Sequence, residues 1–245
     1  MKTREQLEAT GNKILNSVRT ELYLSMRFMG PALGSLGFAM DLSTRTVGTD
    51  AVYIRFNPTY LLQTYIERPE ILNRTYMHML MHCLFRHMFS AKQHEDAQLW
   101  DLCCDIAVES VVDSMDYPAI LRVTSDLREQ WYAKLREEAG VLTAEKIYHY
   151  FILKKRDPYE EETLRQEFAL CDHSFWERMT PPEDKNPEKN DENNIISHRS
   201  NNKETPVKED VNWLVYGVCG CGIIVIGALG VILYVKSRKD DPFQS

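Results

Sequence analysis

Residues 75–87 read Thr-Tyr-Met-His-Met-Leu-Met-His-Cys-Leu-Phe-Arg-His, a mostly apolar stretch with three histidines. It continues a pattern typical of a long helix that Pro69 opens. His78 and His82 are four residues apart, so on a helix they lie about 40° apart on one face, one turn from each other. Two imidazoles placed in this way can coordinate one zinc ion, and their spacing is that of the H-E-x-x-H motif.

The position between the two histidines that matters for catalysis is occupied by Met79. In H-E-x-x-H sites a glutamate stands there and acts as the general base for the attacking water. A thioether accepts no proton at neutral pH, so this chain lacks the usual base. We therefore predict no catalytic residue here. If the domain is nevertheless a hydrolase, Glu109 and Asp101 on the next helix are the nearby alternative bases.

Further metal ligands must come from other positions. His87 lies about 180° around a straight helix from His78, so it becomes a ligand only if the helix breaks. Asp105 stands in Leu-Cys-Cys-Asp-Ile-Ala-Val, where a buried lone carboxylate is costly without a metal or a hydrogen-bonding partner. The predicted metal ligands, with Zn²⁺ as the expected ion, are His78, His82, Asp105 and His87.

A metal-free interpretation of the same residues stays open. The two helical histidines could hydrogen-bond to carboxylates on the neighbouring helix, and Asp105 could pair with Arg86 or His82. Asp172 and His173, which precede an aromatic pair, are interpreted as a structural hydrogen bond.

The first 179 residues predict an α+β fold that is mostly helical, with a small sheet near its front. Apolar residues at helical spacing from Leu7 to Met26 favour an amphipathic first helix. Thr46–Thr49 and the alternating residues 52–56 favour a short hairpin, closed by Asn-Pro. Further helices are expected at about 60–67, from Pro69 onward, from the cap candidate Asp96 to about Met115, and near 125–138, 143–154 and 159–169.

The C-terminal part of the sequence differs in composition. Residues 213–235 contain no charged residue in 23 positions and are followed by Lys236, Arg238 and Lys239, which favours a transmembrane helix. Residues 180–210 hold four prolines, six asparagines and 13 charges, too polar a stretch to fold alone. We therefore expect a globular domain at 1–179, a disordered polar tether at 180–210, a transmembrane helix at 211–235 and a short basic tail at 236–245.

The net charge of −7 argues against nucleic acid as a partner, because no dense run of basic residues is present to neutralise phosphates. The N-terminus lacks the apolar segment of a secretory signal. We therefore expect a single-pass membrane protein whose globular domain is cytosolic.

Several motifs together resemble one bacterial family. These are Gly48-Thr-Asp50, Phe56-Asn-Pro58, His78-x3-His82-x4-His87, Leu99-Trp100-x4-Asp105-Ile-Ala-Val and Asp172-His173-x2-Trp176. The combination is similar to the family described as a putative metallopeptidase domain, which precedes von Willebrand A-like domains. In place of an A-like domain this chain has the polar stretch and the apolar segment.

The resemblance spans about residues 1–179 and implies a zincin-like helical core. It implies that the family's His-Glu-x-x-His, further His and Asp match His78, His82, His87 and Asp105, with Met79 at the Glu position. It also implies that the strand at 52–56 lies beside the histidine helix as a substrate-aligning edge strand.

We therefore expect a membrane-tethered metallopeptidase-like domain that is catalytically impaired and binds a metal, a protein or a peptide. The alternatives are an active zinc-dependent peptidase and a metal-free structural interaction module.

Overall fold

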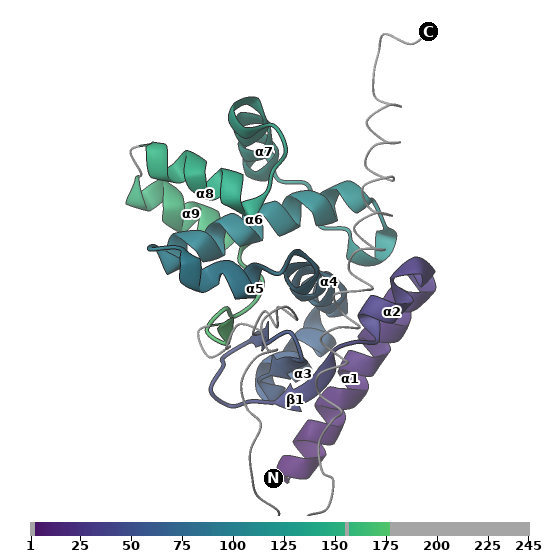
Figure 1. Cartoon of the computed structure of the whole chain (residues 1–245). Helices are drawn as coiled ribbons and strands as arrows, with labels where there is room; N and C mark the ends of the chain where they lie inside the picture. The colour runs from purple at the N-terminus through teal and green to yellow at the C-terminus, as the bar shows by residue number, and fades with distance from the viewer. Residues whose placement is uncertain (1–2, 155–156, 177–245) are drawn as a thin grey trace, which may run out of the picture.

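A helix that is buried on every side forms the centre of the domain. The computed structural model describes residues 3–154 and 157–176. In it, α4 (Pro69–Phe85) packs against α1 (Arg4–Ser25), α3 (Pro58–Glu67) and α6 (Ala97–Met115) (Figure 1). Every residue of α4 from Leu72 to Leu84 is buried. Its polar side chains therefore need partners inside the protein.

A three-stranded sheet lies against this helical core. Its order is β1 (Gly37–Met40), β3 (Tyr53–Phe56) and β2 (Val47–Thr49), with β1 parallel and β2 antiparallel to β3. Val47 pairs with Phe56 and Thr49 with Ile54, which confirms the predicted hairpin. The expectation that residues 52–56 form an edge strand is wrong, because β3 is the central strand. β2 lies on the outer side of the hairpin instead.

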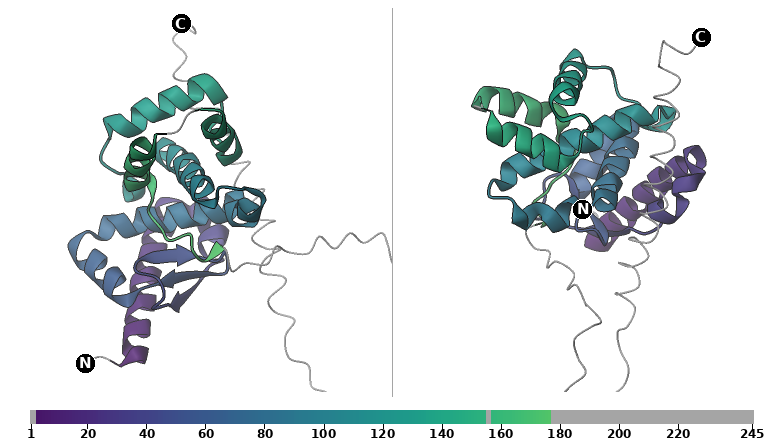
Figure 2. Two further views of the ribbon diagram at one scale, coloured as in Figure 1. Left: turned by 90° about the vertical axis from the view of Figure 1, so that its left-hand side faces the viewer. Right: turned by 45° about the horizontal axis from the view of Figure 1, so that its top comes forward.

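A second group of helices covers the other side of α6. It consists of α7 (Asp126–Ala139), α8 (Ala144–Leu153) and α9 (Pro158–Phe168), and Figure 1 shows α4 and α6 between this group and the sheet. After α9 the chain returns to the sheet, as the left view of Figure 2 shows. There Asp172 forms a parallel bridge with Gly48, and its N–H donates to the carbonyl oxygen of Val47 at 2.7 Å.

The predicted helices are confirmed, with ends set by local capping. Asp96 caps α6 by accepting a hydrogen bond from the N–H of Leu99 at 3.0 Å, and Asn57 caps α3 in the same way. Short elements complete the fold: α2 (Gly30–Leu33), α5 (His87–Ser90) and three 3-10 turns at Arg27–Met29, Ala91–Gln93 and Pro118–Ile120.

The helix α4, which carries His78 and His82, ends with Arg86 as its C-cap, although glycine is the usual residue at such an end. Arg86 takes the left-handed conformation, with φ 62° and ψ 27°, and α5 begins at His87. This conformation is uncommon for a residue with a side chain. The helix therefore does break before His87, and the straight-helix placement of that residue does not apply.

The expected tether at 180–210 and the expected membrane helix at 211–235 lie outside the described residues. Within the described ranges, the structure contains no helix with both the length and the apolar character needed to cross a membrane.

Candidate metal centre

Five side chains converge between α4, α6 and residues 169–176, which follow α9 and are called the return segment below. They are His78 and His82 from α4, Asp105 from α6, and Cys171 and His173 from the return segment. The two α4 histidines share a helix face as their spacing predicts, and their Nε2 atoms are 2.8 Å apart. Asp105 is presented from α6, which packs against α4.

The carboxylate of Asp105 lies among the three imidazoles. Its Oδ1 is 3.0 Å from Nε2 of His78, 3.2 Å from Nε2 of His82 and 3.2 Å from Nε2 of His173. The donor atoms of the three histidines and Cys171 all lie within 4.8 Å of one another. Four ligands around zinc are held about 3.3–3.7 Å apart, given bond lengths of about 2.0–2.3 Å. The 2.8 Å between the two α4 nitrogens is shorter than this spacing and the 4.8 Å limit is longer, so side-chain shifts of about 1 Å would bring the donors to the spacing of a zinc site.

Each histidine has a polar partner on its other nitrogen. Nδ1 of His78 is 2.8 Å from Oε1 of Glu109, and Nδ1 of His82 is 3.0 Å from Nδ1 of His87. Nδ1 of His173 is 3.8 Å from Oδ2 of Asp101. Hydrogen bonds such as those of His78 and His82 fix the ring orientation and tautomer of metal-binding histidines, whereas the 3.8 Å contact of His173 is too long to do so. The Nε2 atoms of His78 and His82 are therefore oriented towards a common centre.

The donor set of the cluster bears on the metal interpretation as well as its spacing. The His173 side chain is 8% exposed, and its Nε2 pairs with Oδ1 of Asp105 at 3.2 Å. Imidazole nitrogens, a carboxylate and a thiol gathered at one buried point are donors that zinc takes, so these residues fit a metal ion.

The charges of the cluster are strongly coupled. Burial opposes ionisation of Asp105, but the neighbouring His173 holds the pKa of this carboxyl well below its usual range. Burial likewise opposes ionisation of Cys171, yet His173 and His78 lower the pKa of its thiol. Burial and the adjacent His78 lower the pKa of His82. Burial opposes protonation of His78 and His173, but Asp105 and Cys171 raise the pKa values of both imidazoles well above the usual range. A bound metal would take the place of these protons, because it needs the anionic carboxylate, the anionic thiolate and neutral imidazoles.

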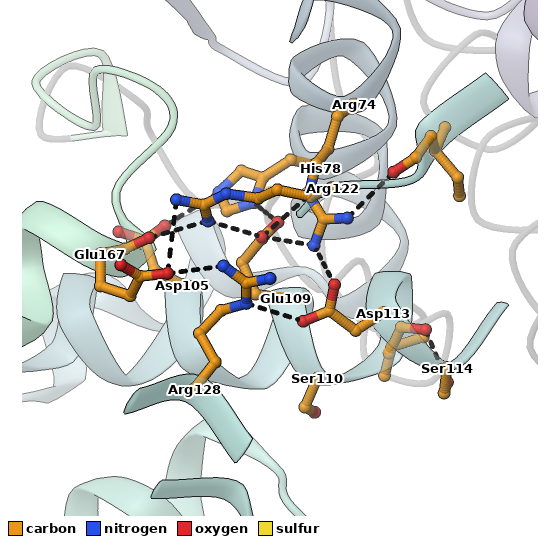
Figure 3. Close-up of polar contacts among 12 residues, drawn as sticks. Arg74, His78, Asp105, Glu109, Ser110, Asp113, Ser114, Arg122, Arg128 and Glu167 are labelled. Atoms are coloured by element: carbon orange, nitrogen blue, oxygen red, sulfur yellow. Dashed lines mark hydrogen bonds and ion pairs between the residues drawn. The ribbon is translucent and has the colours of Figure 1, made fainter. Parts of the chain in front are cut away.

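An ion-pair network contacts the cluster through Glu109, on the Nδ1 side of His78 (Figure 3). Nε and Nη2 of Arg74 donate to Oε2 of Glu109 at 3.0 and 2.6 Å, and Nη2 also donates to Asp113 at 2.6 Å. The Glu109 side chain is fully buried, and that of Arg74 is 5% exposed. Because Glu109 also holds His78, the arginine fixes the position of a metal-facing ring through one intermediate carboxylate.

The same network continues to the second helical group. Arg128 donates to Asp113 at 3.2 Å and to Glu167 at 2.5 Å. Nη1 of Arg122 donates to the carbonyl oxygen of Glu167 at 2.8 Å and lies 3.5 Å from Glu109. The network therefore links α9, just before the return segment, to the helices that carry His78 and Asp105.

A cavity of about 690 Å³ opens beside the cluster. Its lining includes Thr46, which precedes β2, Thr75 on α4 and several arginines of the network. Among the described residues that line it, Cys171 is the member of the metal cluster.

The predicted site residues fall into two groups. His78, His82 and Asp105 meet at the centre, whereas His87 lies on the far side of His82, with its pKa lowered to about 3 by burial. Its place as a ligand stays a prediction. Asp172 and His173 do not act as one structural pair. His173 reaches Asp105, while Asp172 accepts a hydrogen bond from the N–H of Ser174 at 2.9 Å.

The sequence interpretation missed the roles of Cys171, His173 and Arg74. The Asp-His-x2-Trp motif was the available signal for His173. Arg74 could have been suspected as a lone cation in the apolar helix that carries His78.

A comparison with protein families identifies the family of this chain. The family model described as "Putative metallopeptidase domain" matches residues 15–210, which is more than half of the chain. A search of curated proteins and a search of solved structures found no match. A match of this extent, together with histidines, a carboxylate and a thiol gathered around one point, shows that the chain belongs to the Putative metallopeptidase domain family.

Proposed function

We propose that this protein is a membrane-tethered member of the family that binds one metal ion, lacks peptidase activity and serves as a protein-binding or peptide-binding module. The observation that carries the proposal is the convergence of the Nε2 atoms of His78, His82 and His173 on Oδ1 of Asp105, within 2.8–3.2 Å contacts. Mixed nitrogen, oxygen and sulfur donors suit zinc among the common divalent ions.

Zinc, when bound, would supply Lewis acidity and lower the pKa of a water ligand. The chain itself supplies no base of the H-E-x-x-H kind. Met79 is 1% exposed and belongs to the hydrophobic core. The proposal of an impaired enzyme rests on this position.

The alternative bases on α6 are poorly placed. Glu109 contacts Nδ1 of His78, the ring nitrogen that faces away from the cluster, and its other oxygen binds Arg74. Asp101 lies on the Nδ1 side of His173. Each carboxylate thus lies on the side of an imidazole ring that faces away from the centre of the cluster. Among residues 3–154 and 157–176, the alternative function, an active zinc peptidase, has no supporting carboxylate at the centre other than Asp105.

Metal analysis tests the metal part of this proposal. Full-length protein purified in detergent without chelators is expected to carry close to one equivalent of zinc. His82→Ala is expected to lose most of it, because second and third ligands contribute cooperatively to a preformed site. The measurement is elemental analysis of the protein after gel filtration.

His149→Ala provides the matched control, since His149 is exposed and outside the cluster. This variant should retain the wild-type zinc content. Metal-free wild-type protein after exposure to zinc, with unchanged stability of His82→Ala, would favour the structural interaction module instead.

Membrane tethering rests on the sequence of residues 213–235 alone. The full-length chain is expected to pellet with membranes and resist carbonate extraction, whereas a chain that ends at Asp210 should not. In the full-length chain, Ile224→Arg together with Ile226→Arg should also release the protein, because each central arginine costs about 2.5–3.5 kcal/mol on insertion. Full-length protein in the supernatant of a carbonate-washed fraction would contradict the tether.

The binding role is supported by the cavity of about 690 Å³ beside the cluster. It is large enough for a few residues of a peptide. Nucleic acid is excluded from this proposal by the net charge of −7.

A further inference from the structure

Cys171 is the member of the cluster that faces the cavity. Its Sγ atom lies within 4.8 Å of the donor nitrogens of all three histidines. Two of these histidines come from α4, and the third comes from the same segment as Cys171. Four ligating side chains from two parts of the chain far apart in the sequence therefore meet at this point.

The backbone around Cys171 is held against the outer edge of the sheet. The N–H of Asp172 donates to the carbonyl oxygen of Val47 at 2.7 Å, and Asp172 pairs with Gly48 in parallel orientation. A Cβ atom on Gly48 would lie 2.3 Å from the carbonyl oxygen of Asp172 and 2.6 Å from the Phe175 ring. Only glycine leaves room for the return segment to approach β2 so closely.

This arrangement resembles the way a peptide ligand binds to an exposed strand. In β-augmentation an extended peptide adds a strand to a sheet edge through main-chain hydrogen bonds. Here the chain's own Asp172, the residue after Cys171, forms a bridge to the edge of β2 beside the metal cluster. The described lining of the cavity includes Cys171 but none of the three clustered histidines.

We infer that Cys171 is a thiolate ligand of the metal in the position that faces the cavity, and that its neighbour Asp172 is an internal occupant of the β2 edge. The loaded site is therefore closed by the protein itself. Metal binding forms the sulfur–metal bond and releases the thiol proton to solvent, and no electron is transferred. This inference rests on the proposed metal site and adds the ligand that closes the site on the side of the cavity.

Cobalt substitution of the full-length protein in detergent tests the inference. Co²⁺ bound to the wild-type chain should show the near-ultraviolet charge-transfer absorption of a cobalt–thiolate bond together with visible bands of a low-symmetry site. Cys171→Ser should lose the charge-transfer band and keep visible bands from histidine ligation. Cys83→Ser is the matched control, because Cys83 is buried and its sulfur contacts Oγ1 of Thr49 at 3.9 Å.

Gly48→Ala tests the contribution of the β2 edge. The added Cβ must push the return segment outward, so the charge-transfer band should weaken while cobalt still binds. An unchanged band in Gly48→Ala would overturn the inference that the close contact with β2 holds the thiolate in place.

Alkylation of the wild-type protein provides a measurement that needs no variant. Mass spectrometry of the peptide containing Cys171 should show about tenfold slower alkylation with zinc at ten times its dissociation constant, because about one molecule in eleven then has a free site. Equal alkylation rates with and without zinc would overturn the inference.

The outcomes separate this inference from the metal proposal. Cobalt binding without a charge-transfer band in the wild-type protein would overturn the thiolate ligand and leave the histidine site standing. A wild-type protein that binds no cobalt or zinc would overturn both.

Discussion

Arg74→Met is expected to lower the free energy of unfolding by about 3–5 kcal/mol, because it removes the closest charge partner of the buried Glu109 and leaves only the longer contact with Arg122 at 3.5 Å. The Arg74 guanidinium donates to Glu109, to Asp113 and, at 2.9 Å, to the carbonyl oxygen of Ile120. Methionine retains much of the side-chain volume and removes every donor. Urea unfolding at constant zinc concentration, followed by tryptophan fluorescence, measures the effect.

A double variant separates the charge from the packing. Glu109→Gln removes the carboxylate that Arg74→Met would leave unpaired, so the two changes together should destabilise the protein by clearly less than the sum of the single variants. Additive effects would show that the guanidinium does not stabilise the protein through Glu109. Lys154→Met is a matched control, because its pair with Glu138 at 3.1 Å is about half exposed and should contribute at most about 1 kcal/mol.

The network also couples stability to the metal site. Glu109 accepts from Arg74 with one oxygen and contacts Nδ1 of His78 with the other. Displacing the carboxylate should therefore loosen a metal-facing ring. Outer-shell partners of this kind commonly change metal affinity by about 10–100-fold when they are removed.

Local patterns predicted most of the fold. The helices around His78 and Asp105 follow from apolar periodicity and from the cap at Asp96, which are properties of neighbouring residues. The hairpin follows from alternation and the Asn-Pro that closes it. Residues 37–40 carry no such alternation, and their strand exists because they pair with β3 in the folded protein.

The site was predictable to the extent that it is local. His78 and His82 share a face by helix geometry alone, and Asp105 was suspected because of its apolar surroundings. His173 and Cys171 enter from about 90 residues further along the chain, through a return segment that a single Gly48 bridge helps to fix. No periodicity encodes such an approach. The break before His87 was also not predictable, because Arg86 takes a left-handed conformation that is uncommon for a residue with a side chain.

The proposed loss of peptidase activity rests on two separate positions, Met79 and Cys171. Met79 lies in the hydrophobic core and cannot take a proton from water. Cys171, by the inference above, fills the position through which a substrate would approach from the cavity. The zinc-loaded wild-type protein is therefore expected to show no cleavage of unstructured proteins or peptide libraries above background.

Restoring activity should require both changes. Met79→Glu supplies a carboxylate one position after His78, and general acid–base catalysis by such a group is typically worth about 10²–10⁴-fold. Cys171→Ser removes the thiolate. Peptide hydrolysis by the zinc-loaded double variant should therefore exceed that of either single variant, and Met79→Gln with Cys171→Ser should remain inactive because an amide is no base. Chelator-sensitive cleavage by the wild-type protein that Glu109→Gln abolishes at unchanged zinc content would show instead that α6 supplies the base.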